Sequence, residues 1–260
     1  MVLQFAKWQG TGNDFILVDD RQGVFPSGDE ALVRRLCDRH FGIGSDGLIL
    51  LQAPREAGHA YHMEFFNPDG SRSFCGNGSR CAYGFWCALT GDRSPVRFAA
   101  IDGAHTAAWL DGLVRIGMRD VAGVERVDAR TDRAHTGSPH LLVWVDDPDE
   151  VDLVPQARAI RYNAEHAAAG INVNFLRWAN GRVEMRTYER GVEAETLSCG
   201  TGVTAAALAA MARGHAGTSC AVSTKGGELR VDAVPDGRGG YVQVHLSGPV
   251  AHVFTGQFEP

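Results

Sequence analysis

Two short stretches of this sequence share a pattern of residues that can do chemistry. The first is Cys75-Gly76-Asn77-Gly78, and the second is Cys199-Gly200-Thr201-Gly202. Each has a thiol, then a hydrogen-bonding side chain between two glycines, and each leads into residues that favour a helix. A strand-like segment and a polar turn precede each pattern. The repetition indicates two related halves of the chain, each with one cysteine.

A cysteine at the start of a helix has a distinct reactivity. The helix N-terminus carries N–H groups without partners and a partial positive charge. The pKa of a free cysteine, about 8.5, falls to roughly 3.5–7.5 at such positions. The glycines leave nearby N–H groups open to an anion, and a carboxylate is the obvious small one.

Two such thiols facing one another could act on a single carbon atom. One thiolate would remove the proton beside a bound carboxylate, and the opposite thiol would deliver a proton to the other face. Preorganised donors aimed at the carboxylate would stabilise the carbanion. The pattern therefore predicts stereoinversion by two cysteine bases, Cys75 and Cys199.

Other chemistries explain the pattern less well. A pyridoxal phosphate enzyme needs a Schiff-base lysine, and the only lysines, Lys7 and Lys225, lie in no convincing cofactor motif. Zinc sites favour cysteines two to four residues apart, unlike Cys75 and Cys81, so we expect neither cofactor nor metal. A Cys-His hydrolase using His140 stays open but does not explain the repetition. A non-catalytic protein that binds small anions also stays open.

The composition is that of a globular protein with small-molecule partners. The chain has 260 residues and a net charge of −6, and its arginines are scattered, so we expect no nucleic-acid binding. No apolar run is long enough to span a membrane, and the first residues do not resemble a signal peptide. We therefore expect a cytoplasmic location with reduced cysteines. The other four cysteines are expected to be buried free thiols: Cys37, Cys81, Cys87 and Cys220.

Hydrophobic patterning predicts an α/β (α+β) protein in which each half has strands, one central helix and further strands. In the first half, a helix over residues 29–39 begins near Ser27 or Asp29. The glycine-rich segment 41–47 precedes an apolar strand and not a helix, so we interpret it as a tight turn and not a phosphate cradle. The central helix covers 79–89, and the expected strands are 3–8, 14–19, 48–51, 61–66, 96–101, 105–110 and 113–118.

Residues 119–136 have a looser composition and are expected to lead into the second half. A helix over 151–161 is opened by Pro155, and the second central helix covers 201–213. Asn180-Gly181 predicts a hairpin between two of the strands. The expected strands are 140–145, 171–178, 182–188, 220–224, 228–234, 241–246 and 250–254.

In this order and spacing, a series of motifs resembles the diaminopimelate epimerase family across nearly the whole chain. Besides the two cysteine motifs it includes Gly12-Asn13-Asp14-Phe15, residues 42–47 and 66–70, Gly137-Ser138-Pro139-His140, residues 172–175, Glu189-Arg190-Gly191 and Gly248-Pro249. The resemblance implies two pseudo-symmetric domains, each a curled, mostly antiparallel β-sheet or barrel around a central helix. It places residues 1–118 with 250–260 in one domain and 119–249 in the other.

The resemblance also implies an activity: epimerisation of LL-diaminopimelate to meso-diaminopimelate without a cofactor, on the route to lysine and peptidoglycan. Another cofactor-independent amino-acid racemase on the same fold is the alternative. Members of the family are typically homodimers.

Site residues follow from the resemblance position by position. Cys75 and Cys199 would be the two bases, tuned by His140 and Glu189. The reacting carboxylate would lie against Gly76, Asn77, Gly200 and Thr201. The distal end of the substrate would be held by Asn13, Asn67, Asn172, Glu189 and Arg190, whose guanidinium suits a carboxylate.

The sequence departs from the family at two positions near the site. Gly47 stands where some members have a substrate-binding Gln, and Ser138 replaces an Asn that often contacts substrate. The spacing between Asn67 and Cys75 is one residue shorter than usual, and that between Glu189 and Cys199 is one longer. Neither Gly47 nor Ser138 is therefore assigned a substrate contact.

Overall fold

The computed structural model describes residues 2–259, and these form two compact units. One unit comprises the described part of Met1–Ile116 and Gly248–Pro260, and the other comprises Gly117–Ser247. Each unit is a mixed α/β structure in which strands surround one buried helix. The α/β fold class expected from the sequence is confirmed.

In the first unit the buried helix is α2 (Gly76–Thr90), and a shorter helix, α1 (Glu30–Cys37), lies between two strands in the chain. Asp29 caps α1 by accepting a hydrogen bond from the Leu32 N–H, as predicted. The strands are β1 (Leu3–Gly10), β2 (Asn13–Asp20), β3 (Gly47–Gln52), β4 (His62–Phe66), β5 (Val96–Ala100), β6 (Gly103–Leu110), β7 (Leu113–Gly117) and β17 (Ala251–Phe258).

In the second unit the buried helix is α4 (Gly200–Ala212), and α3 (Leu153–Arg161) follows a 3₁₀ turn, η1 (Pro148–Glu150). The strands are β8 (Val124–Arg126), β9 (Thr131–His135), β10 (Pro139–Trp144), β11 (Asn172–Ala179), β12 (Arg182–Glu189), β13 (Ala194–Thr196), β14 (Ser219–Thr224), β15 (Gly227–Pro235) and β16 (Tyr241–Gly248).

Strand pairing repeats between the units in the same order. In the first unit β1–β2 is antiparallel, β2–β3 parallel, β3–β4 antiparallel, β4–β5 parallel, and β5–β6 and β6–β7 antiparallel. In the second unit β9–β10, β10–β11, β11–β12, β12–β14 and β14–β15 follow the same sequence of directions, and β15–β16 is again antiparallel. The repeat seen in two cysteine motifs therefore extends to whole units.

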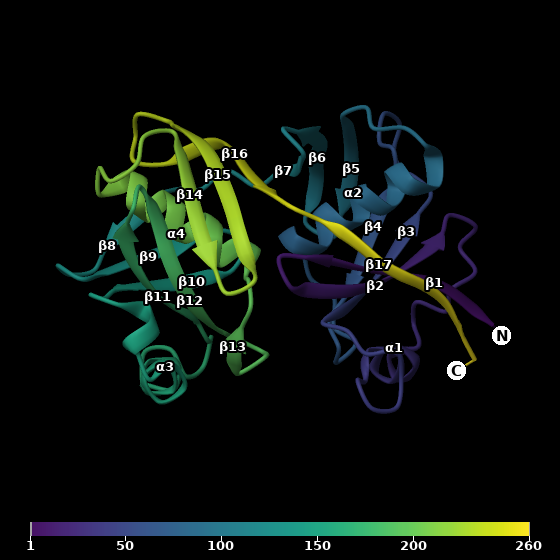
Figure 1. The fold of residues 1–260 in the computed structure, drawn as a ribbon, viewed down its shortest axis with the longest axis horizontal. Helices are drawn as coiled ribbons and strands as arrows, with labels where there is room; N and C mark the ends of the chain where they lie inside the picture. The colour runs from purple at the N-terminus through teal and green to yellow at the C-terminus, as the bar shows by residue number, and fades with distance from the viewer. Residues whose placement is uncertain (1, 260) are drawn as a thin grey trace. The chain divides into compact units, whose positions relative to one another are not determined.

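Each unit also gains an outer strand on its first hairpin. The C-terminal strand β17 pairs antiparallel with β1, and Figure 1 shows it in yellow beside the purple N-terminal strand. In the second unit the equivalent strand is β8, which pairs antiparallel with β9.

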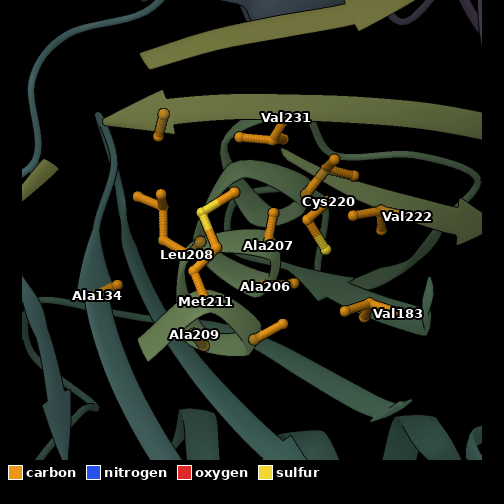
Figure 2. Close-up of a cluster of buried hydrophobic side chains, with 14 of the residues drawn as sticks. Ala134, Val183, Ala206, Ala207, Leu208, Ala209, Met211, Cys220, Val222 and Val231 are labelled. Carbon is orange, nitrogen blue, oxygen red and sulfur yellow. The ribbon is translucent and has the colours of Figure 1, made fainter. Parts of the chain in front are cut away.

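Helix α4 is buried because nearly every side chain on it is small or apolar. In α4 the run Ala205–Met211 contacts strands on several sides, so the helix has no polar face. Figure 2 shows these side chains among Val183 of β12, Cys220 and Val222 of β14, and Val231 of β15. A helix surrounded in this way is fixed in position, and so is the residue at its N-terminus.

Several predicted boundaries are wrong, and each error has a physical cause. Helix α2 begins at Gly76 and not at Ser79, because the glycines of the motif form the first helical turn in spite of their low propensity. Pro155 does not open α3, since it lies in the first turn, where no intrahelical N–H bond is lost. The loose segment 119–136 contains β8 and β9, whose short polar strands resemble a linker.

The predicted turns are largely confirmed. Asn180 and Gly181 both have positive φ and join β11 to β12 in an antiparallel hairpin. Segment 41–47 leads directly into β3 and not into a helix, which confirms the tight-turn interpretation. Among residues 2–259, no helix is long and apolar enough to span a membrane.

Candidate active site

In the first unit, Cys75 is the N-cap residue of α2. Its backbone is extended, with φ −131° and ψ 111°, and its Sγ accepts a hydrogen bond from the Gly78 N–H at 3.3 Å. The Ser79 hydroxyl donates to the Cys75 carbonyl at 2.8 Å and secures the start of the helix. The thiol thus lies at the positive end of a buried helix, where a thiolate is stabilised.

Asn77, in the first turn of α2, is buried and held from two directions. Its Oδ1 accepts from Nη1 of Arg80 at 2.9 Å, so its amide nitrogen points the other way and donates to Oδ1 of Asn13 at 3.3 Å. Asn13 in turn donates to Asp46 at 2.7 Å. The structure therefore brings Asn13 and Asn77 together, with both amide orientations fixed by their neighbours.

Asn67 lies in the turn after β4 and is bound within that turn. The Gly70 N–H donates to its carbonyl at 2.9 Å, as expected for the predicted turn. Its amide nitrogen lies within 3.2 Å of the hydroxyls of Ser71 and Ser73.

Gly47, the first residue of β3, has no room for a side chain. A Cβ atom there would lie 2.4 Å from a ring carbon of Phe65 and 2.8 Å from the Phe66 carbonyl. A side chain at this position would therefore require a shift of Phe65 or of the β4 backbone.

In the second unit, Cys199 is the N-cap residue of α4 and has nearly the same backbone, with φ −120° and ψ 110°. Its side chain makes no capping hydrogen bond to the helix, and its Sγ lies 3.5 Å from the Thr201 hydroxyl. Beyond Thr201 lies His140 of β10, which is fully buried, with its Nε2 3.0 Å from Thr201 Oγ1 and 3.1 Å from Ser138 Oγ.

The tautomer of His140 follows from its neighbour Asn174 of β11. Oδ1 of Asn174 accepts from Thr187 at 2.9 Å, and its Nδ2 donates to the Leu141 carbonyl at 3.0 Å and faces His140 Nδ1 at 3.3 Å. Nδ1 must therefore accept, and Nε2 carries the proton. Burial, with smaller contributions from His135 and Arg190, lowers the pKa of His140 to about 3, so the ring is neutral.

These directions produce a chain of donors that ends at a thiol. Asn174 donates to His140, and His140 Nε2–H can donate to the Thr201 hydroxyl. Thr201 can then donate to Cys199 Sγ. We call this set the hydroxyl chain: Asn174, His140, Thr201 and Cys199. Its members are fixed closely, since a Cβ on Gly202 would lie only 2.9 Å from Asn174 Oδ1 and 3.3 Å from His140.

Asn172 joins Arg190 to the same network. Its amide nitrogen donates to Ser138 Oγ at 3.0 Å and to the Pro139 carbonyl at 3.1 Å, and its Oδ1 accepts from the Arg190 N–H at 2.8 Å. The Arg190 guanidinium is exposed and donates to the Ala169 carbonyl, while the Glu189 carboxylate accepts from Thr196 at 3.0 Å.

The other four cysteines are buried and unlinked, as the sequence predicts. Burial raises the pKa of Cys37, Cys81 and Cys87, and raises that of Cys220 to about 11. These thiols are protonated at neutral pH. Among residues 2–259, no cluster of three or more His, Cys, Asp or Glu side chains could hold a metal ion.

Sequence reasoning did not assign Arg80, Ser138 or Asn174 to the site, yet all three bind assigned residues. Asn174 could have been found, because it lies two residues after Asn172 and therefore on the same face of the strand. Arg80 lies three residues after Asn77, a spacing that brings side chains together on a helix. Ser138 gave no such signal.

The family comparison and the relatives in sequence agree on one family. The sequence matches the family described as "Diaminopimelate epimerase" over residues 5–114 and 133–253. A diaminopimelate epimerase of Flavobacterium psychrophilum is 39% identical over 97% of this chain and 98% of its own length. One from Aquifex aeolicus is 36% identical, with 98% and 97% covered.

Solved structures show that the fold is shared more widely. A hydroxyproline epimerase from Agrobacterium vitis superposes with a TM-score of 0.73 at 16% identity, covering 98% of this chain and 92% of that one. A phenazine biosynthesis protein of Bacillus anthracis gives 0.72 at 13% identity, with both chains fully covered. The matches in sequence, which are far closer, identify the chain as a member of the diaminopimelate epimerase family.

Proposed function

We propose that this protein interconverts LL- and meso-diaminopimelate by a two-thiol mechanism, on the route to lysine and peptidoglycan. One observation carries the proposal: each unit presents a cysteine as the N-cap of its buried central helix, followed by a glycine-flanked polar residue. The names of relatives that are 34–39% identical favour this substrate over that of another amino-acid racemase.

In this mechanism one thiolate takes the α-proton and the opposite thiol supplies the new one. In the reverse direction the roles exchange. The helix N-termini bind the reacting carboxylate through Gly76, Asn77, Gly200 and Thr201, because free N–H groups and the helix dipole favour an anion there. His140 and Glu189 adjust the protonation of the thiols.

Asn13, Asn67, Asn172, Glu189 and Arg190 hold the distal amino-acid end. The exposed guanidinium of Arg190 can bind a carboxylate with two hydrogen bonds. The proposed domains, residues 1–118 with 250–260 and residues 119–249, differ from the two compact units by two residues at each boundary. Each domain contains one of the two proposed bases.

The reaction needs no pyridoxal phosphate. Lys7 is buried and forms an ion pair with Asp14 at 2.6 Å, and Lys225 forms one with Glu195 at 2.9 Å. Both amines are engaged by carboxylates, and neither is placed to form a Schiff base. We further propose a cytoplasmic homodimer, on the basis of the cysteine usage and the family resemblance. A monomer in sedimentation equilibrium would contradict that assembly.

The test is epimerisation of LL-diaminopimelate in deuterium oxide. The wild-type protein should form meso-diaminopimelate with deuterium at the α-carbon. Cys75→Ala and Cys199→Ala should each lose about 10²–10⁴-fold in rate, the range for losing a positioned acid or base. Cys87→Ala, which removes a thiol near the far end of α2, is the matched control and should stay active. Normal turnover by either active-site variant would refute the mechanism.

A second assay separates the substrates. Turnover of a monocarboxylic amino acid, with none of LL-diaminopimelate, would favour the alternative racemase.

A further inference from the structure

Arg80 is a buried cation without an anionic partner. Its side chain has no exposed surface, and its guanidinium donates to two neutral oxygens, Asn77 Oδ1 at 2.9 Å and Thr11 Oγ1 at 3.0 Å. Its Nε has no hydrogen-bond partner. Within residues 2–259, no carboxylate lies within 4.0 Å of it. Burying a cation in this way is costly unless an anion compensates for it.

The other charged groups in this part of the unit already have partners. Asp14 pairs with Lys7 and Arg39, and Asp46 pairs with Arg39, with all distances between 2.6 and 2.7 Å. On β4, Glu64 pairs with Arg72 at 3.3 Å.

One titratable pair lies beside the residue that precedes Cys75. His105 stacks on Phe74 with ring centroids 4.3 Å apart, and its Nε2 lies 2.9 Å from Asp102. His105 is therefore also matched by a carboxylate. Arg80, unlike these groups, has no carboxylate partner, so an anion at the N-terminus of α2 would compensate its charge.

The direction of the Arg80 side chain indicates which group could compensate its charge. Helical side chains lean toward the N-terminus of their helix. The contact of Arg80 with Asn77 shows that its guanidinium lies under the first turn of α2. Cys75 caps that turn. Burial lowers the pKa of Arg80 to about 10, opposed by its interactions with Cys81 and Cys75, so the side chain remains charged at neutral pH.

We propose that Arg80 is a positioning residue that supplies the counter-charge for the Cys75 thiolate and fixes the Asn77 amide. This inference builds on the two-thiol function proposed above. The corresponding residue of α4 is Thr204, five residues after Cys199, whose hydroxyl donates to the Gly200 carbonyl at 2.9 Å. Helix α4 contains no arginine or lysine. Arg80 therefore lowers the pKa of the Cys75 thiol in the free enzyme.

The test measures the thiols directly, without substrate. The rate of iodoacetamide alkylation is followed against pH, and mass spectrometry of peptides separates Cys75 from Cys199. Burial changes the rate at each site, whereas the midpoint of the profile reports the pKa. In the wild-type protein the Cys75 midpoint should lie at least about one unit below that of Cys199, a tenfold difference in ionisation. A Cys75 midpoint at or above the ordinary cysteine value of about 8.5 would refute the proposal without any variant.

Variants of Arg80 then test whether its charge lowers the Cys75 midpoint. Arg80→Met should raise the Cys75 midpoint by about one unit or more and leave that of Cys199 unchanged, while Arg80→Lys should keep most of the wild-type value. An unchanged Cys75 midpoint in Arg80→Met would overturn the assignment. If Arg80→Met does not fold, as judged by circular dichroism, Arg80→Lys and the wild-type comparison still decide.

The outcome is independent of the proposed reaction. Normal epimerisation by Cys75→Ala would refute the two-thiol function while leaving the alkylation result intact. Loss of epimerisation in Cys75→Ala, with no effect of Arg80 on the thiol, would refute only the role of Arg80.

Discussion

The two units hold their cysteines in the same way but support them differently. Strand register makes the positions equivalent: Phe15 pairs with Gly47 at the start of β2–β3, as His140 pairs with Asn172 at the start of β10–β11. Two residues further along, Ile49 in the first unit corresponds to Asn174 in the second. At this register position the strand residue is therefore apolar in the first unit and polar in the second.

The central helices show the opposite distribution. In α2 the buried polar groups include Asn77 and the guanidinium of Arg80, whereas the corresponding residues of α4 are Thr201 and Thr204. A repeated fold thus carries a charge on the helix in one copy and a neutral chain of donors from the strands in the other. In the mechanism proposed above, this difference favours the thiolate at Cys75, and a two-base reaction needs one thiol ionised and the other protonated at each turnover.

Breaking the hydroxyl chain should give the largest effect on the second unit. His140→Phe removes the ring nitrogens and leaves Asn174 and Thr201 without that partner, so we expect a loss of about 100-fold in kcat/KM. His140→Gln can restore a donor and should recover to within about tenfold of wild type. Steady-state epimerisation measures both, and alkylation of Cys75 should keep its wild-type midpoint. Full activity in His140→Phe would show that the chain does not support Cys199.

The same histidine should make stability depend on pH. Its pKa is lowered to about 3 in the folded protein, mainly by burial, from an ordinary value of 6.5. Above pH 6.5 it is neutral in both states, and below that pH only the unfolded state takes up the proton. The free energy of unfolding should therefore fall as the pH drops from 6.5 toward 3, by about 2 kcal/mol at pH 5.

Urea unfolding at pH 7, 6 and 5 measures this effect, with His140→Gln as the reference. Carboxylates titrate in both proteins, so their contribution cancels in the difference. Parallel curves for the two proteins would mean that His140 is protonated in the folded state, and the contrast between a charged and a neutral half-site would fail.

The sequence predicts the features that the two units share better than the features in which they differ. The two Cys-Gly-polar-Gly motifs predict two N-capping thiols, because small residues and a following apolar run indicate a helix start. The short strands β8 and β9 were missed since their polar residues pair without a strong alternating pattern. The roles of Arg80 and Asn174 depend on which side chains meet across elements, and local pattern carries little of that information.

The smallest expected effects concern Gly78 and Gly202, each three residues after one of the two cysteines. A methyl group on Gly202 would lie 2.9 Å from Asn174 Oδ1, which Thr187 and the strand hold in place. On Gly78 it would lie 3.1 Å from the end of the Ile49 side chain, which can shift. Alanine also favours a helix by up to about 1 kcal/mol over glycine.

We therefore expect Gly202→Ala to destabilise the protein by about 1–2 kcal/mol, and Gly78→Ala to change stability by less than about 0.5 kcal/mol, because only the first displaces a hydrogen-bonded group. Urea unfolding measures both, with Gly28→Ala as the control at an exposed glycine that has open space around it. Equal losses in the two helices would mean that the apolar wall of Ile49 is as rigid as the hydroxyl chain. The polar network of the second unit would then be no more fixed in geometry than the apolar contact in the first.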